Sequence, residues 1–209
     1  MIGRSTMVEA DPARVEDGIA FVRDRVHPVV DSLPGSRGLG MWVNRETGQI
    51  MVHSEWEDRA TLDASASQIA ELRDEASRLM GARSVRVEIV ELVVGWQAAA
   101  DQPGYWARFV EMTVPVANLD KGIAMFRDEV LPATQQFPGV NTCVLLVNRE
   151  TGLCFVSVTY RSRGEMEAAR ERALAVRSSA VDRLGANPPV VRELEKTIVG
   201  IRPPEPRMS

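Results

Sequence analysis

The chain has 209 residues, of which 44% are hydrophobic and 26% charged, as is typical of a globular protein with an apolar core. Its net charge of −4 offers no basic surface for neutralising phosphates, so nucleic acid is not an expected partner. No apolar run approaches the roughly 18 residues of a membrane-spanning helix, and no secretory signal is visible, so we expect a cytoplasmic protein without a membrane partner.

The sequence contains an internal duplication with an offset of 104 positions. The run Val43–Gly48 recurs unchanged as Val147–Gly152. Between Arg4 and Ala82, roughly 24 of 79 positions are identical to their counterparts in an ungapped comparison, far more than chance allows. Two homologous units therefore follow one another in one polypeptide.

The boundaries of the two units follow from the same comparison. One extra residue is expected in the second copy after Ala82, because Val94-Gly95 then aligns with Val199-Gly200. We predict a first repeat at residues 1–95, a linker at 96–107, a second repeat at 108–200 and a flexible tail at 201–209.

Each copy predicts the order strand, helix, strand, strand, helix, strand. The first strand is expected at Ser5–Ala10 in one copy and at Phe109–Val114 in the other. The helix that follows carries Pro28 or Pro132 inside its apolar pattern. Because proline lacks a backbone N–H, we predict a kink or break of the helix there.

The two unchanged runs are predicted to be hairpin turns. In the first copy the turn joins strands at Leu39–Val43 and Ile50–Trp56, and in the second it joins Cys143–Val147 and Cys154–Tyr160. Asparagine opens such a turn, and glycine accepts the left-handed conformation that closes it. We interpret the repetition as a requirement of turn geometry.

The second helix of each copy has a visible start. Asp58 is the expected cap in the first copy, and Ser162 with Glu165 is a capping box in the second. The last strands are expected at Val85–Val94 and Val190–Val199.

This element order is that of the ferredoxin-like fold, with two helices on one face of a four-stranded antiparallel sheet. The strands are apolar on both alternations, as at Met41-Trp42 and Leu145-Leu146, so neither sheet face is expected to be wet. We therefore predict an α+β fold in which two βαββαβ repeats pack sheet to sheet as an intramolecular dimeric α/β barrel. Further homo-oligomerisation of this pseudo-dimer stays open.

The two cysteines, Cys143 and Cys154, both lie in strands of the second copy. Because neither is repeated, we expect reduced thiols that pack in the core, in a reducing compartment.

Each half resembles a dimeric α/β-barrel domain of the antibiotic biosynthesis monooxygenase type. The resemblance rests on Leu33-Pro34-Gly35, on the hairpin Val43–Gly48 and on Glu55-Trp56-Glu57-Asp58. Members of this family include cofactor-independent oxygenases of aromatic quinols and haem-degrading enzymes. The resemblance implies a ligand pocket between helices and sheet beside a tryptophan at the end of the third strand, which matches Trp56, with Tyr160 as its counterpart.

The chain departs from the family at two expected catalytic positions. The asparagine that the family places four residues before the tryptophan is Val52 here, with Val156 as its twin. The histidine expected early in the second helix is Ser65, with Ala169 as its twin.

The remaining candidates are few. His27 and Trp56 are the candidate catalytic residues, and Trp42, Trp56 and Tyr160 are the candidate ligand-binding residues. His27 could act as a base or a haem ligand if it faces the pocket, and is structural otherwise. His53 is expected on the opposite sheet face from Trp56. Two histidines on separate elements predict no metal site.

Two functions stay open. The first is an oxygenase-like enzyme that binds a small hydrophobic or aromatic molecule and needs no cofactor, with haem as an alternative ligand implied by the resemblance. The second is a binding or structural barrel that lost its catalytic residues. The missing asparagine and histidine favour the second, whereas Trp56 favours the first.

Overall fold

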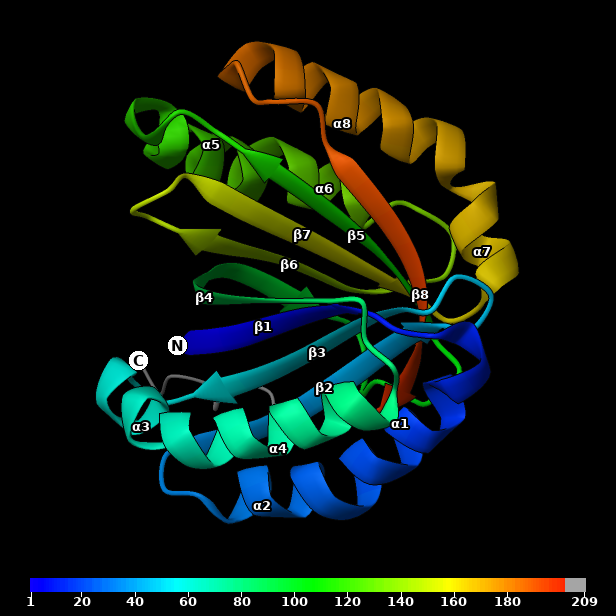
Figure 1. The fold of residues 1–209 in the computed structure, drawn as a ribbon. Coiled ribbons are helices and arrows are strands. Elements are labelled where there is room, and N and C mark those ends of the chain that lie inside the picture. Colours follow the sequence, from blue (N-terminus) through cyan, green and yellow to red (C-terminus); the bar gives the residue numbers. More distant parts are fainter. Residues whose placement is uncertain (202–209) are drawn as a thin grey trace.

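Eight antiparallel strands close into a barrel in the computed structural model, which describes residues 1–201 (Figure 1). The strands are β1 (Ile2–Glu9), β2 (Ser36–Asn44), β3 (Gln49–Trp56), β4 (Ser84–Gln97), β5 (Trp106–Thr113), β6 (Val140–Asn148), β7 (Leu153–Tyr160) and β8 (Val190–Ile198). The helices are α1 (Val15–Phe21), α2 (His27–Ser32), α3 (Arg59–Ala64), α4 (Ala66–Leu79), α5 (Leu119–Met125), α6 (Leu131–Thr134), α7 (Arg163–Ala168) and α8 (Arg170–Leu184).

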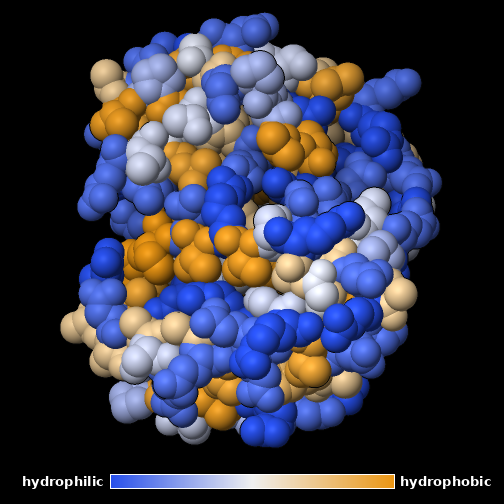
Figure 2. Space-filling model, in the orientation of Figure 1, coloured by the Kyte–Doolittle hydropathy of each residue, from blue (hydrophilic) through white to orange (hydrophobic). Residues whose placement is uncertain are grey.

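The barrel is built from the two repeats. Its strand order is β1-β3-β2-β8-β5-β7-β6-β4, so the halves join where β2 pairs with β8 and β4 with β6. Helices α1–α4 cover the outer face of the first half and α5–α8 that of the second (Figure 1). Figure 2 shows hydrophobic residues gathered in a band between these two helical layers. The predicted α+β pseudo-dimer, with its sheets face to face, is confirmed.

The first helix of each repeat changes its winding before the proline. Val22–Val26 and Phe126–Val130 are π-helical, and Pro28 and Pro132 fall in the first turn of the α-helix that follows. A proline ring clashes with the carbonyl four residues earlier and offers no N–H. The wider π turn accommodates both defects, so the predicted distortion is confirmed and has a defined form.

The hairpin turns are as predicted. Gly48 and Gly152 adopt left-handed conformations, with φ of 74° and 72°. The Asn44 side-chain oxygen accepts hydrogen bonds from the backbone N–H groups of Glu46 and Thr47, and Asn148 repeats the arrangement.

The arginine of each turn also forms ion pairs outside the turn. Arg45 pairs with Glu16 of its own half and with Glu195 on β8 of the other half. Arg149 likewise pairs with Asp120 and with Glu91 on β4. The repeated run therefore also links the two halves, which turn geometry alone did not predict.

Strand β4 extends beyond the predicted Val85–Val94, because its end pairs with β6 of the other half. The connection between the halves is thereby limited to residues 98–105. Of the predicted tail, 201–209, only Ile201 belongs to the described residues.

The register of the last strands corrects one prediction. Val90 pairs with Gly3, and Leu194 pairs with Ala107, so the offset of 104 continues through β4 and β8. The alignment of Val94-Gly95 with Val199-Gly200 is therefore wrong by one residue. Strand pairing sets the register, and a two-residue sequence match is too short to override it.

Candidate functional site

Each half places a buried arginine beside an aromatic ring, between sheet and helices. In the first half Arg4 on β1 lies against Trp56 on β3, and in the second Arg108 on β5 lies against Tyr160 on β7. The guanidinium carbon is 5.9 Å from the ring centroid in both. The duplication has thus produced two equivalent positions for a site.

In the first half these polar groups are satisfied. Arg4 donates to the Ser65 hydroxyl and, at 2.9 Å, to the Leu62 carbonyl. The Trp56 indole N–H donates to the Ser54 hydroxyl at 3.1 Å, and Trp56 is fully buried. This arrangement leaves nothing for a ligand to satisfy.

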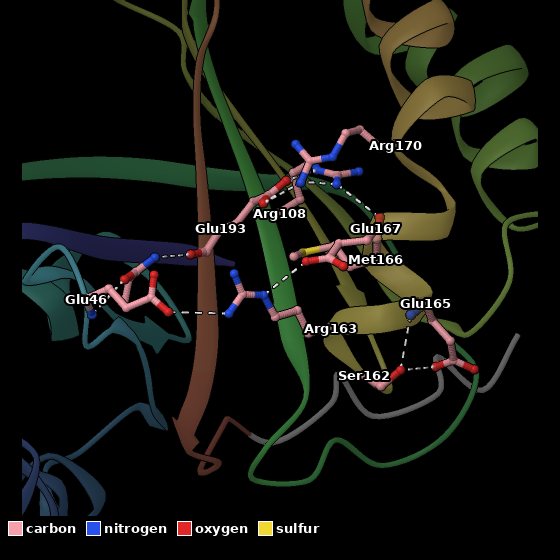
Figure 3. A network of polar contacts seen from close by, with 10 residues as sticks. Glu46, Arg108, Ser162, Arg163, Glu165, Met166, Glu167, Arg170 and Glu193 are labelled. Carbon is pink, nitrogen blue, oxygen red and sulfur yellow. Dashed lines mark hydrogen bonds and ion pairs between the residues drawn. The ribbon is translucent and has the colours of Figure 1, made fainter.

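In the second half the corresponding hydroxyls are missing. Ala169 replaces Ser65, and Val158 replaces Ser54. Arg108 still binds the Met166 carbonyl at 3.0 Å and Glu193 at 2.8 Å (Figure 3). Its Nη1 atom and the Tyr160 hydroxyl are nevertheless buried and make no hydrogen bond of normal geometry. Buried polar groups without partners are rare and costly, which marks this position as unusual.

A cavity of about 90 Å³ lies beside these unsatisfied groups, between the sheet and helices α5 and α8. Its walls are almost entirely apolar. Several side chains that line it are smaller than their counterparts in the first half. Ile69, Leu72 and Ile50 are replaced by Ala173, Val176 and Cys154.

Burial sets the electrostatics of this cavity. It raises the pKa of the Tyr160 hydroxyl to about 12, against the opposing effect of Arg108. It also lowers the pKa of Arg177, with the charge of Arg108 acting in the same direction. The cavity thus combines a neutral phenol with cationic guanidinium groups in apolar surroundings. Such a site can accept an anionic oxygen on an apolar molecule.

The structure separates the residues that the sequence singled out. Tyr160 lines the helix-side cavity, whereas Trp42 and His53 line a different cavity inside the barrel. Trp56 lines neither of these two cavities. His53 and Trp56 lie on opposite sheet faces, as predicted.

His27 lies away from both cavities. It belongs to α2, its Nε2 atom is 3.4 Å from the Asp31 carboxylate, and its ring packs against Gly200. His27 and Trp56 are therefore not brought together around a ligand, and their catalytic roles stay predictions.

Sequence reasoning missed Arg108. The signal was available, because Arg4 recurs as Arg108 at the repeat offset, and an arginine kept at the start of a buried strand needs a reason.

The residues of the helix-side cavity do not fit haem. No histidine is among those that line the helix-side cavity, and about 90 Å³ is far too small for a porphyrin. Within residues 1–201, no group of three or more His, Cys, Asp or Glu side chains is placed to hold a metal ion. Over the same residues, no helix has the length and apolarity needed to cross a membrane.

Sequence comparison identifies close relatives, although no family model matches the chain. The uncharacterized protein Rv2558 of Mycobacterium tuberculosis (strain H37Rv) is 34% identical over 203 residues, covering 97% of this chain and 86% of the relative. The uncharacterized protein Rv2557 of the same strain is 29% identical over 202 residues, covering 97% and 90%.

Solved structures share the fold. A protein from Lactobacillus acidophilus NCFM, proposed to be a monooxygenase, matches with a TM-score of 0.72 at 13% identity, over 96% of both chains. An anthrone oxidase-like protein matches with a TM-score of 0.69 at 16% identity, over 94% of this chain and 91% of its own. A heme-degrading enzyme from Listeria monocytogenes matches with 0.53 at 7%, over 92% and 98%.

Proposed function

Because this chain belongs to the family of the mycobacterial protein Rv2558 and has the dimeric α/β-barrel fold of proteins related to antibiotic biosynthesis monooxygenases, we propose that it binds a small aromatic molecule with an acidic oxygen in the helix-side cavity of its second half. The single observation that carries this proposal is the pair of unsatisfied buried groups, Arg108 Nη1 and Tyr160 Oη, beside an apolar cavity.

Charge complementarity supports an anionic oxygen. The Tyr160 hydroxyl stays protonated up to about pH 12 and can donate a hydrogen bond. Glu193 pairs with both Arg108 and Arg170, and Arg177 also lines the cavity, so three guanidinium groups lie near one carboxylate. A phenolate or enolate oxygen would accept from both Tyr160 and Arg108. In apolar surroundings such charge-assisted hydrogen bonds are roughly twice as strong as neutral ones.

The size of the cavity limits the ligand to about one ring. About 90 Å³ is below the roughly 150 Å³ of a cavity known to hold benzene, so a ring requires a small outward movement. Helix α8 is suited to it, because it contacts the cavity through the small side chains Ala173, Val176 and Ala180.

Titration of 4-nitrophenol in the presence of the protein tests the proposal, because its phenolate absorbs visible light. We expect binding that lowers the pKa of the phenol, since Arg108 stabilises its anion. Ala169→Ser supplies the hydroxyl that satisfies Arg4 in the first half, and should weaken binding by about fivefold to tenfold. Ser65→Ala, the matched change in the first half, should leave binding unchanged.

The opposite pattern would contradict the proposal. Binding that is weakened by Ser65→Ala and not by Ala169→Ser would assign the ligand to the first half. Absence of binding to phenols of one ring would remove the proposed function.

A second candidate function is oxygenation without a cofactor. It is favoured by the same cationic and hydrogen-bonding groups, because an anion of an electron-rich aromatic is the form that reacts with O₂. In such a reaction with a single-ring hydroquinone, one ring C–H becomes C–OH, the quinol is oxidised to the quinone, and the second oxygen atom of O₂ leaves as water. Oxygen uptake with hydroquinone that falls at least tenfold in Arg108→Met would support it, and uptake equal to that in buffer would exclude it.

A further inference from the structure

The barrel interior holds a second and larger cavity of about 640 Å³, which we call the barrel chamber. It occupies the end of the barrel covered by the connection between the halves and by the segment after β8, through Ala100, Asp101 and Ile201. Its volume lies in the range of sites for small molecules, and it is separate from the helix-side cavity.

Beyond the chamber the barrel interior holds packed apolar side chains and ion pairs. Below the chamber lies an apolar layer that includes Met7, Leu153 and Leu194. Beyond that layer Glu111 pairs with Arg86 and, at 2.8 Å, with Arg192. The chamber is therefore a feature of one end of the barrel.

One wall of the chamber carries ionisable groups from the first half. The His53 Nδ1 atom is 2.8 Å from the Ser5 hydroxyl, and its Nε2 atom is 3.7 Å from the Glu55 carboxylate. The imidazole lies over Gly3, where any side chain would overlap it. The His53 Nε2 atom has no hydrogen-bond partner, although the side chain is buried.

A second polar group stands beside this wall. Lys196 on β8 is paired with Asp101 of the connection and lies 4.8 Å from the centroid of the Trp42 ring. The Trp42 indole N–H is buried and also lacks a hydrogen-bond partner. Because an indole N–H can only donate, it requires an acceptor.

The facing wall, from the second half, has a different character. Phe109 and Phe155 occupy the positions that Ser5 and Met51 hold in the first half, and Phe109 packs edge-on against Trp42. The chamber thus has an aromatic side and a side with hydrogen-bonding groups.

We propose that the barrel chamber is a second binding site, for an uncharged aromatic molecule that carries an alcohol or carbonyl oxygen. The ring lies against Phe109 and Phe155, and the oxygen accepts from the Trp42 indole N–H.

The charges of the chamber argue against an anion. Lys196 is already neutralised by Asp101, and Glu55 adds a further carboxylate nearby. Because a buried anion would be close to two carboxylates with only one ammonium group, its binding would be costly. This preference is the opposite of that proposed for the helix-side cavity, so the two sites can be told apart by ligand charge.

Nuclear magnetic resonance and calorimetry with three probes test the proposal. The probes are 2-naphthol, 2-naphthoate and naphthalene. We expect 2-naphthol to bind and to shift the indole N–H resonance of Trp42, which is identified by its loss in Trp42→Phe. Naphthalene should bind about fivefold to tenfold more weakly because it lacks the acceptor, and 2-naphthoate more weakly still.

Two matched variants locate the ligand. Ser157→Phe fills the chamber and should weaken 2-naphthol binding at least tenfold, whereas Ala173→Ile fills the helix-side cavity and should leave it unchanged. Equal binding by Ser157→Phe and the natural protein would overturn the proposal, as would tighter binding of 2-naphthoate than of 2-naphthol. Loss of binding in Ala173→Ile alone would assign the ligand to the other cavity. Because the helix-side proposal is tested with single-ring phenols, either proposal can fail without the other.

Discussion

The two halves of the barrel have the same fold and the same buried arginine, yet they differ in how that arginine is bound and in the cavity beside it. In the first half Ile69 and Trp56 fill the space between sheet and helices, and Ser65 satisfies Arg4. In the second half smaller side chains leave a cavity and Arg108 is left partly unsatisfied. Duplication within one chain allows this difference, because one half can stabilise the barrel while the other tolerates a cavity.

The last strands of the two repeats, β4 and β8, also differ, and this difference involves the connection between the halves. Lys196 on β8 corresponds to Leu92 on β4, and only the lysine needs a partner, Asp101. We expect Asp101→Ala to lower the free energy of unfolding by about 4 kcal/mol, because it leaves a buried ammonium group unpaired. The double variant with Lys196→Leu, which restores the residue type of β4, should recover most of this loss. Urea unfolding measures both, and a double variant no more stable than the single one would contradict the interpretation.

Creating a cavity in the first half tests whether its side chains are packed more tightly than those of the second half. Ile69→Ala introduces the residue of the second half, and we expect it to cost about 3 kcal/mol through lost packing and a new cavity. The reverse change, Ala173→Ile, should be neutral or slightly stabilising, because it fills existing space. Thermal unfolding of both variants gives the answer, and equal losses would mean that the halves are packed alike.

The two thiols give the second half a pH dependence of its own. Burial raises the pKa of Cys143 to about 12 and that of Cys154 to about 11. Their contribution to stability is complete below about pH 9 and is lost as the pH rises from there to the raised values; the loss for the two thiols is about 3 kcal/mol at pH 10.

The matched control takes its residues from the first half, which has Leu39 and Ile50 at these positions. The double variant Cys143→Leu/Cys154→Ile should lose less stability between pH 7.5 and pH 10 than the natural protein. Identical losses in urea unfolding at the two pH values would show that the thiols do not carry the effect.

Two equivalent glycines, Gly18 and Gly122, differ in the space available for a side chain. A β-carbon at Gly18 would overlap the Met80 side chain, whereas one at Gly122 would lie 3.3 Å from a terminal carbon of Leu184. Gly18→Ala should therefore cost about 1 kcal/mol through overpacking, and Gly122→Ala should stabilise α5 by about 0.5 kcal/mol. Chemical unfolding resolves the two signs, and destabilisation by both changes would be inconsistent with a looser second half.

The barrel could be predicted from the sequence because its signals are local and occur twice. The hairpin glycines, the helix prolines and the strands apolar on both faces each point to one conformation. The register of the last strands was harder, because pairing with a distant strand sets it and a short sequence match misled the alignment.

The site could be predicted only in part. Trp56 was predicted to line a ligand pocket, because a large aromatic side chain offers a flat surface for a ligand. In the structure its side chain packs in the core of the first half. The cavity depends on the summed effect of Ala173, Val176 and Cys154 relative to their larger counterparts, and no single residue predicts it. Whether a buried guanidinium is satisfied is a matter of three-dimensional geometry that sequence spacing does not convey.

The location of a bound phenol tests the central claim most directly. A crystal of the protein soaked with 4-bromophenol would place the bromine by its anomalous signal. Our interpretation predicts a bromine peak between α8 and the sheet of the second half, with the phenol oxygen within hydrogen-bonding distance of Arg108 and Tyr160. A peak beside Trp56 in the first half, with none beside Tyr160, would contradict it.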